Sequence, residues 1–236
     1  MRISKKNLKI FLYVAFFIVF IIIIIKRNYI EGYKDTNNMP TFHILIATAG
    51  RQSLKRLLDS LKDELSEDDA ITIVFDGAGA KEKSRYSKEW FSQHICKYTV
   101  IEQEPNLGAG IGGEPIRTKY QTLLKPETTY IMYADDDDEY IKGSFKKLRG
   151  LCIDPDILYI AKMKYADDLN LVIPRQSNKI VFTDIGTPNG IVTFHSAGKA
   201  EWGMRYGGDY DYYNSLQYKV KRVVFLEEVI YMVYRK

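Results

Sequence analysis

Short apolar runs take turns with stretches of helical periodicity along most of this chain, and that alternation limits the folds open to it. The first run, "FHILIA" (42–47), is followed by leucines at helical spacing, namely Leu54, Leu57, Leu58, Leu61 and Leu65. Three more runs follow: "ITIVF" (71–75), "YTVIE" (98–102), which comes after a polar stretch expected to be helical, and "TYIMYA" (129–134). Ile116, Tyr120, Leu123 and Leu124 mark a helix before the last run. Near-continuous apolar strands between helices predict an α/β fold, with a mostly parallel sheet and helices on both faces.

Carboxylates follow two of these strands directly. Asp76 ends the second run, and Asp135, Asp136, Asp137 and Asp138 come immediately after the fourth. Ligands of such sheets bind at the carboxyl ends of the strands. Because adjacent carboxylates repel one another, we expect a divalent cation with oxygen ligands, together with a bound phosphate, to compensate for the charge. The alternative is a solvated acidic turn that caps the next helix.

Several motifs, in order, resemble those of GT-A fold glycosyltransferases of the family 2 type, from about Thr41 to Leu226. They are "ILIATAGR", "IVFDG", "NLGAGIGGEPIRTKY" and a D-x-D-type motif within the aspartate run. The resemblance implies a GT-A, Rossmann-like fold. It also implies metal-dependent, inverting transfer of a sugar from a nucleotide sugar, with UDP as the expected nucleotide, to an acceptor hydroxyl on a glycan.

The resemblance also implies roles for individual residues on the donor side. The expected donor-binding residues are Thr48, Arg51, Asp76 (at the base), Asn106, Gly108, Arg117, Asp135 and Asp136. Asp135 and Asp137 match the two ends of the D-x-D and are the expected ligands of Mn²⁺ or Mg²⁺, with Asp137 favoured as the direct ligand. Asp136 and Asp138 also lie within reach of the ion.

The segment "EWGMRYGGDYDYY" resembles the family's Glu-Asp motif, in which the Asp removes the acceptor proton. Asp209 stands at the Asp position and is the expected catalytic base, whereas Gly208 replaces the usual Glu. Asp211 is the alternative base if the register shifts by two residues, and Asp209 could also serve as a helix N-cap.

The acceptor is expected to contact Trp202 and the preceding segment "DIGTPNGIVTFHSAG", which contains Asn189. A Trp ring can stack on a sugar, and the glycine-containing turn permits close backbone approach. The alternative is that Trp202 is a core residue, as a single Trp often is.

Residues 10–25, "IFLYVAFFIVFIIIII", form 16 consecutive apolar residues flanked by lysines and arginines. This pattern is typical of an uncleaved membrane anchor, because no small-residue cleavage site follows as a secretory signal peptide would require. The expected organisation is a cytoplasmic tail and transmembrane anchor (1–27), a linker (28–40) and a glycosyltransferase domain (41–236). The excess of basic residues before the run predicts a type II orientation in the lipid bilayer, with a luminal catalytic domain.

The net charge of +4 arises from residues near this apolar run, because six of the 34 basic residues lie there. From residue 28 onward, 28 basic residues face 30 acidic ones, so charge argues against nucleic-acid binding.

Two other functions compete with sugar transfer. "GAGIGG" (108–113) satisfies the G-x-G-x-x-G pattern and has Asp135 about 20 residues beyond it, as an NAD(P)-binding oxidoreductase would require. The aspartate run could instead hold Ca²⁺ in a membrane-tethered binding module, which would not need Asp209.

Overall fold

The computed structural model describes residues 39–108, 112–125, 127–176 and 178–235. The chain divides into two units, and the one described below spans Pro40–Lys236. The apolar run 10–25 lies outside the described residues. Within the described ranges no helix is long and apolar enough to cross a bilayer, so the expected single-pass membrane placement is corrected.

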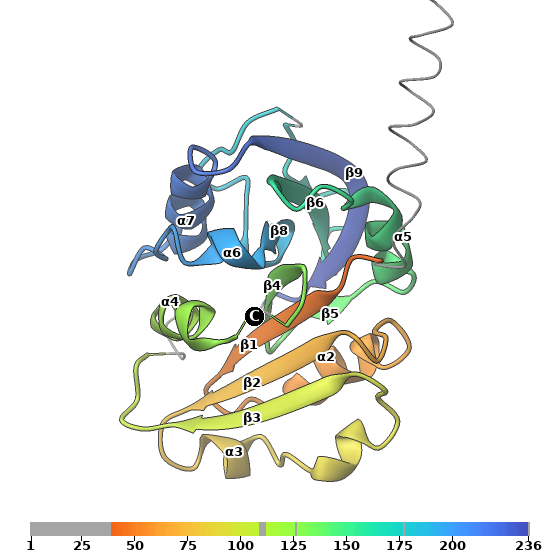
Figure 1. The fold of residues 1–236 in the computed structure, drawn as a ribbon. Coiled ribbons are helices and arrows are strands. Elements are labelled where there is room, and N and C mark those ends of the chain that lie inside the picture. Colours follow the sequence, from red (N-terminus) through yellow and green to blue (C-terminus); the bar gives the residue numbers. More distant parts are fainter. Residues whose placement is uncertain (1–38, 109–111, 126, 177, 236) are drawn as a thin grey trace, which may run out of the picture. The chain divides into compact units, whose positions relative to one another are not determined.

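Four parallel strands make one half of the central sheet (Figure 1). In spatial order they are β3 (Lys97–Gln103), β2 (Ala70–Asp76), β1 (Phe42–Thr48) and β4 (Tyr130–Asp135). Each coincides with a predicted apolar run. In β1 and β2 every residue is buried, because a strand in the middle of a parallel sheet is covered on both faces.

The other half of the sheet is not parallel, which corrects the expectation of a mostly parallel sheet. Beyond β4 the order is β8 (Gly190–Thr193), β6 (Ile157–Tyr165), β9 (Arg222–Val233) and β5 (Glu139–Tyr140), and β7 (Val172–Ile173) pairs with β6. β8 runs antiparallel to both β4 and β6, whereas β6 and β9 are parallel. This half is mixed because β8 and β7 join it without the helical crossovers that keep successive strands parallel.

Helices cover both faces of the sheet. One face carries α2 (Leu54–Leu61), α5 (Ser144–Leu151), the 3₁₀ helix η1 (Lys88–Phe91) and α3 (Ala80–Lys83). The other carries α4 (Glu114–Leu123), α6 (Phe194–Ala197) and α7 (Gly208–Leu216), and a 3₁₀ helix, η3 (Thr187–Asn189), leads into β8.

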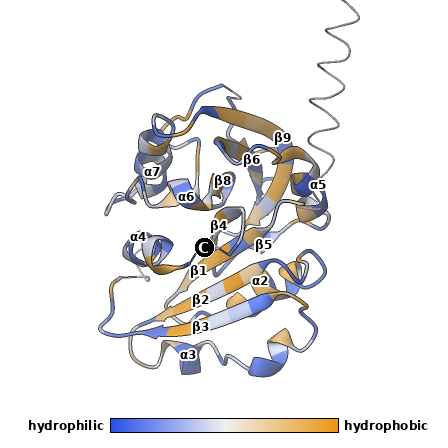
Figure 2. Cartoon of the chain, in the orientation of Figure 1, coloured by the Kyte–Doolittle hydropathy of each residue, from blue (hydrophilic) through white to orange (hydrophobic). Residues whose placement is uncertain are grey.

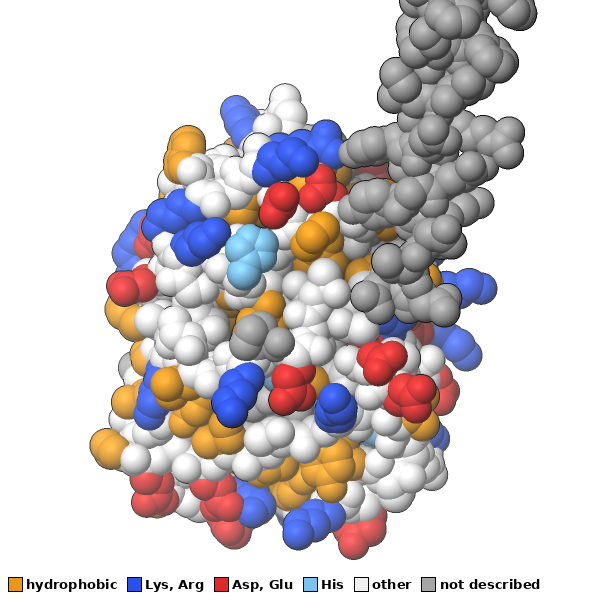
Figure 3. All heavy atoms as spheres, viewed as in Figure 1, with side chains coloured by type: hydrophobic (Ala, Val, Ile, Leu, Met, Phe, Trp, Pro, Cys, Tyr) orange, Lys and Arg blue, Asp and Glu red, His pale blue; other side chains and the backbone are white. Residues whose placement is uncertain are grey.

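A hydrophobic core lies on each face of the sheet, and successive side chains of β1 point alternately into one core and the other. Ile44 and Ile46 pack with the leucines of α2, whereas Leu45 and Ala47 pack with Ile116 of α4. Figure 2 shows the hydrophobic residues concentrated on the strands, with α3 hydrophilic. On the face drawn in Figure 3, basic and acidic side chains are interspersed rather than gathered by sign.

Asp69 stabilises the amino-terminal edge of the parallel strands through hydrogen bonds and an ion pair. It is fully buried and accepts hydrogen bonds from the backbone N–H of Phe42 (2.8 Å) and of Ser66 (2.6 Å). Arg149 of α5 forms an ion pair with it and also donates to the carbonyl of Pro40 (2.8 Å). One carboxylate therefore connects the start of β1, the turn before β2 and a helix on the sheet.

We expect Asp69→Ala to lower the free energy of unfolding by about 3–5 kcal/mol, because it leaves Arg149 unpaired in a mostly buried position. Urea unfolding measures this change. Asp68→Ala, which alters the exposed neighbour, is the matched control and should shift stability by less than about 0.5 kcal/mol. Equal effects of the two substitutions would contradict this account of Asp69.

Candidate active site

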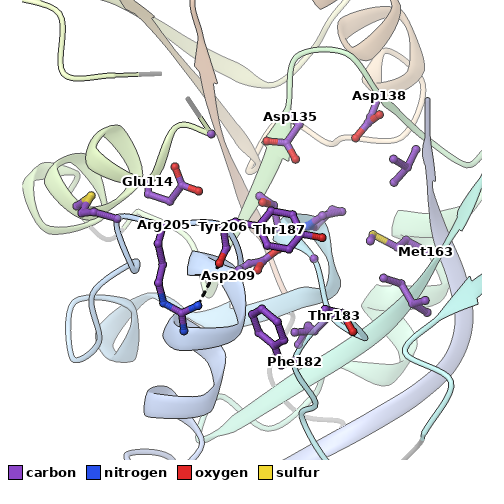
Figure 4. A pocket seen from close by; sticks show the side chains of 18 of the residues that line it. Glu114, Asp135, Asp138, Met163, Phe182, Thr183, Thr187, Arg205, Tyr206 and Asp209 are labelled. Atoms are coloured by element: carbon purple, nitrogen blue, oxygen red, sulfur yellow. Dashed lines mark hydrogen bonds between the residues drawn. The ribbon is translucent and has the colours of Figure 1, made fainter. Parts of the chain in front are cut away.

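A cleft of about 640 Å³ opens at the carboxyl edge of the parallel strands. One side is formed by Arg51, Gly108, Asp135 and Asp138, which follow or end strands. The other is formed by residues 182–183, 185–188, 204–207 and 209. Its volume lies within the range of about 300–1,000 Å³ that is usual for small-molecule sites. Figure 4 shows Asp135 and Asp138 facing the cleft from one side, with Asp209 across from them.

The aspartate run is compensated largely by arginines. Arg51, from the turn after β1, donates through Nη1 to Asp136 (2.7 Å) and to Asp137 (2.9 Å). Arg117 of α4 is 1% exposed and forms an ion pair with Asp135. Thus two cations from separate elements converge on three of the four carboxylates. The alternative of a solvated acidic turn does not fit this arrangement.

Two further contacts join the run to neighbouring parts of the chain. The Thr48 hydroxyl, at the end of β1, donates to Asp136, and Asp138 accepts the backbone N–H of Tyr234 (2.8 Å). Burial raises the pKa of Asp136 and raises that of Asp138 to about 8, the charge of Asp135 adding to the latter rise. Asp138 therefore holds its proton at neutral pH until a cation or another positive group stabilises its charge.

Within the described ranges, no cluster of three or more His, Cys, Asp or Glu side chains is placed to hold a metal ion. Asp135 and Asp138 nevertheless both line the cleft, whereas Asp137, the favoured ligand in the sequence analysis, is engaged by Arg51 and does not line it. Mg²⁺ commonly takes only one or two carboxylates and completes its shell with substrate phosphates and water. The side chains present thus suit a cation that arrives with a diphosphate, rather than one held by protein ligands alone.

Asp76 organises the loop that was expected to approach the nucleotide. Its two carboxylate oxygens accept the backbone N–H groups of Leu107 and Gly108, each at 2.7 Å, and the Asn106 side-chain amide donates to the carbonyl of Asp76 (3.4 Å). Asp76 is 2% exposed, whereas Leu107 and Gly108 line the cleft. The predicted donor-binding residues therefore lie together at the carboxyl edge of the sheet. Asp76 is buried there and fixes the position of the loop through its hydrogen bonds.

Asp209 and Asp211 occupy different environments. Asp209 is the second residue of α7 and lines the cleft; Gly207, with a φ of +84°, is the N-cap residue, so the alternative of an N-cap by Asp209 is excluded. Burial raises the pKa of Asp209 to about 6, although the backbone N–H of Tyr210 donates to its carboxylate (2.8 Å). Asp211 instead pairs with Arg205 (2.6 Å), and although Arg205 lines the cleft, Asp211 does not. Of the two candidate bases, only Asp209 faces the cleft.

Glu114 is a carboxylate in the cleft that sequence reasoning missed. A Cβ placed on Gly208 would lie 2.0 Å from the carbonyl oxygen of Gly203 and 3.0 Å from Cγ of Glu114. No side chain fits at position 208, and Glu114, reaching across from α4, lies in the cleft near Asp209 (Figure 4). Its charge contributes to the raised pKa of Asp209. In the sequence, Glu114 looks only like an acidic residue in the first turn of a helix.

Trp202 and Asn189 lie in the core rather than in the cleft, which corrects their expected contact with an acceptor. Trp202 is 2% exposed, stacks on Tyr212 with ring centroids 4.4 Å apart, and donates to Gln121 (3.2 Å). Asn189 is fully buried and donates to the carbonyl of Ala161 (2.8 Å). Both side chains have satisfied their polar groups inside the protein, as buried polar groups normally do.

The fold is that of nucleotide-sugar glycosyltransferases. S. aureus TarS 1–349, in complex with UDP-GlcNAc, superposes with a TM-score of 0.58 and 15% identity over 83% of this chain and 59% of that one. The mannosyltransferase PcManGT from Pyrobaculum calidifontis, in complex with GDP-Man and Mn²⁺, gives a TM-score of 0.63 and 11% identity over 86% and 61%. The chain thus spans about three fifths of the length of these two proteins.

No protein-family model matches the chain, and no curated protein matches its sequence. At these identities the superpositions establish the fold, and they confirm the resemblance to GT-A glycosyltransferases at that level. The assignment of individual residues depends on the geometry of the cleft described above.

A double-mutant cycle of Arg51→Gln and Asp136→Asn should give a favourable coupling energy of at least about 1 kcal/mol, because Asp136 is buried beside Arg51. Urea unfolding in EDTA measures it without competition from cations. The exposed i,i+4 pair Lys55–Asp59 is the control, expected to couple by about 0.3–0.5 kcal/mol. A coupling no larger than that of the control would mean that Arg51 does not stabilise the aspartate run.

Proposed function

We propose that this protein is an inverting glycosyltransferase, which transfers a sugar from a nucleotide sugar to a hydroxyl group of a glycan acceptor. The observation that carries the proposal is a single cleft that presents Asp135 and Asp138 on one side and Asp209 across from them. The glycosyltransferase fold supports the same conclusion. A calcium-dependent binding module would need Asp135 and Asp138 but not Asp209.

The donor is expected to lie along the edge formed by the turn after β1, the loop held by Asp76 and the aspartate run. Arg51 and Asp135 line this edge, together with the backbone of Leu107 and Gly108. Asp135 and Asp138 are the residues that would hold Mn²⁺ or Mg²⁺ there. A cation bound at this point would act as a Lewis acid and stabilise the charge that develops on the departing diphosphate.

Asp209 is the proposed general base. Its pKa of about 6 leaves the carboxylate ionised at neutral pH and more basic than an exposed aspartate. It can accept the proton of an acceptor hydroxyl as the hydroxyl oxygen attacks the anomeric carbon. Because Asp209 lies across the cleft from Asp135 and Asp138, the attack would come from the face opposite the diphosphate and would invert the anomeric centre.

The proposed donor site predicts that Mn²⁺ or Mg²⁺ tightens binding of UDP or GDP at least about 10-fold, since the cation offsets repulsion between carboxylates and diphosphate. Calorimetry on the purified protein, with and without metal, measures this. Asp138→Asn should remove most of the enhancement, whereas Asp63→Asn, on the exposed surface, should not. Binding of NAD(P) in place of nucleoside diphosphates would favour an oxidoreductase instead.

Asp209→Asn should lower kcat by about 10²–10⁴ and leave UDP affinity within about twofold, because the base acts on the acceptor alone. In the wild type, the rate should fall as the pH drops through about 6, where Asp209 becomes protonated. Transfer assays over pH 4.5–8 with calorimetry in parallel separate the two effects.

Two measurements control this prediction. Asp211→Asn removes the other candidate base and should retain transfer; if that variant is inactive and Asp209→Asn is active, the assignment of the base is wrong. Because the folded-state pKa of Asp209 is raised, its ionised form costs stability once the pH rises through about 6. Asp209→Asn should therefore melt no lower than the wild type at pH 7.5, which excludes unfolding as the cause of lost turnover.

A further inference from the structure

One rim of the cleft exposes large apolar side chains next to the proposed base. Tyr206 is 84% exposed, Met204 63% and Phe182 40%, and all three line the same cleft as Asp209. We call Phe182, Met204 and Tyr206 the rim patch. Apolar side chains gathered at the mouth of a polar cleft commonly mark a ligand surface.

The rings of the rim patch are held in a defined arrangement. Phe182 and Tyr206 lie at 85° with centroids 6.3 Å apart, so Phe182 supports Tyr206 while most of the Tyr206 side chain stays exposed. A Cβ on Gly207 would lie only 2.3 Å from the Phe182 ring, so a glycine is required at that position. The backbone N–H of Asp184 closes the turn beneath Phe182 by donating to the carbonyl of Val181 (3.0 Å).

Thr183, between Phe182 and Asp184, adopts a positive φ of 66° and also lines the cleft. A left-handed backbone is costly for a β-branched residue and is kept only where its surroundings demand it. Asp184 supplies that constraint, because it is 2% exposed and bound by the backbone N–H (2.9 Å) and side chain (2.7 Å) of Arg175. These contacts fix the loop in the conformation in which Phe182 lines the cleft.

The position of the rim patch separates it from the donor edge. In Figure 4, Phe182 lies across the cleft from Asp135 and Asp138, with Tyr206 and Asp209 between them. A molecule resting on Tyr206 would therefore have a hydroxyl within reach of Asp209, while the diphosphate occupies the opposite edge.

We propose that Tyr206, supported by Phe182, forms the acceptor subsite and binds the ring face of a hexopyranose residue. This inference rests on the proposed function and names its acceptor class. A pyranose has an apolar C–H face that suits an exposed aromatic ring, and an edge of hydroxyls that suits nearby carboxylates. Asp209 and Glu114 supply those carboxylates, one at the reacting hydroxyl and the other available to accept from a neighbouring hydroxyl.

A purely aliphatic occupant fits this surface poorly. Glu114 and Asp209 lie in the same cleft as the rim patch, and an alkyl chain would remove water from both carboxylates without offering a hydrogen bond. An acyclic polyol would satisfy the carboxylates but has no fixed apolar face to stack on Tyr206. The combination of an aromatic ring and carboxylates therefore selects a cyclic sugar.

Saturation-transfer NMR on the protein loaded with UDP and Mg²⁺ tests this subsite. The probes are the methyl pyranosides of glucose, galactose, mannose and N-acetylglucosamine, with sorbitol as the acyclic control. We expect ring C–H signals from at least one glycoside and none from sorbitol. Tyr206→Ala should weaken that glycoside about 3- to 10-fold, whereas Tyr206→Phe, which keeps the ring, should retain it.

Tyr218→Ala is the matched control, because Tyr218 is 80% exposed but does not line the cleft, and it should change nothing. Calorimetry of UDP on the same variants keeps the two hypotheses apart. If UDP binds but no glycoside does, or if Tyr206→Ala binds the glycosides as the wild type does, the subsite is refuted and the donor site stands. Loss of UDP affinity in Tyr206→Ala would place the donor on the rim patch and also refute it. Failure of UDP to bind the wild type would count against the proposed function itself.

Discussion

The carboxyl edge of this sheet depends on the compensation of the charge carried by Asp135, Asp136 and Asp137. Carboxylates buried this closely would destabilise the fold without nearby cations. Arg51 and Arg117 reach them from the turn after β1 and from α4, so ion pairing joins β1, β4 and α4 at one point. The same contacts leave Asp135 and Asp138 along the cleft, where a cation could meet them together with a phosphate.

Arg117 connects this edge to the aromatic core. It is nearly inaccessible, it pairs with Asp135, and its guanidinium lies 5.1 Å from the centre of the Trp202 ring. Trp202 in turn stacks on Tyr212 of α7. The ring that was expected to bind a sugar thus supports the arginine that holds a cleft carboxylate. Exposed aromatic rings are supplied instead by the loop at Phe182 and the turn at Tyr206.

The parallel half of the sheet could be predicted from the sequence, because β1, β2 and β4 each consist of a compact apolar run and β3 contains the shorter run Val100–Ile101. The other half could not, since the antiparallel pairing of β8 with β4 and β6 depends on contacts far apart in the chain. The same limit applies to the site. Asp76 and Asp209 could be singled out as candidates by their places in motifs. The position of Glu114 beside Asp209 becomes evident only once α4 and α7 are placed in the fold. A Trp next to a motif likewise does not indicate which way its ring faces.

The start of α7 explains why glycines surround the proposed base. Gly207 lets the chain enter the helix with a positive φ and lets the Phe182 ring approach, and Gly208 makes room for the carbonyl of Gly203 and the stem of Glu114. A side chain at either position would displace a wall of the cleft. Position 208 thus has no room for a side chain, and Glu114 of α4 supplies the second carboxylate that lines the cleft with Asp209.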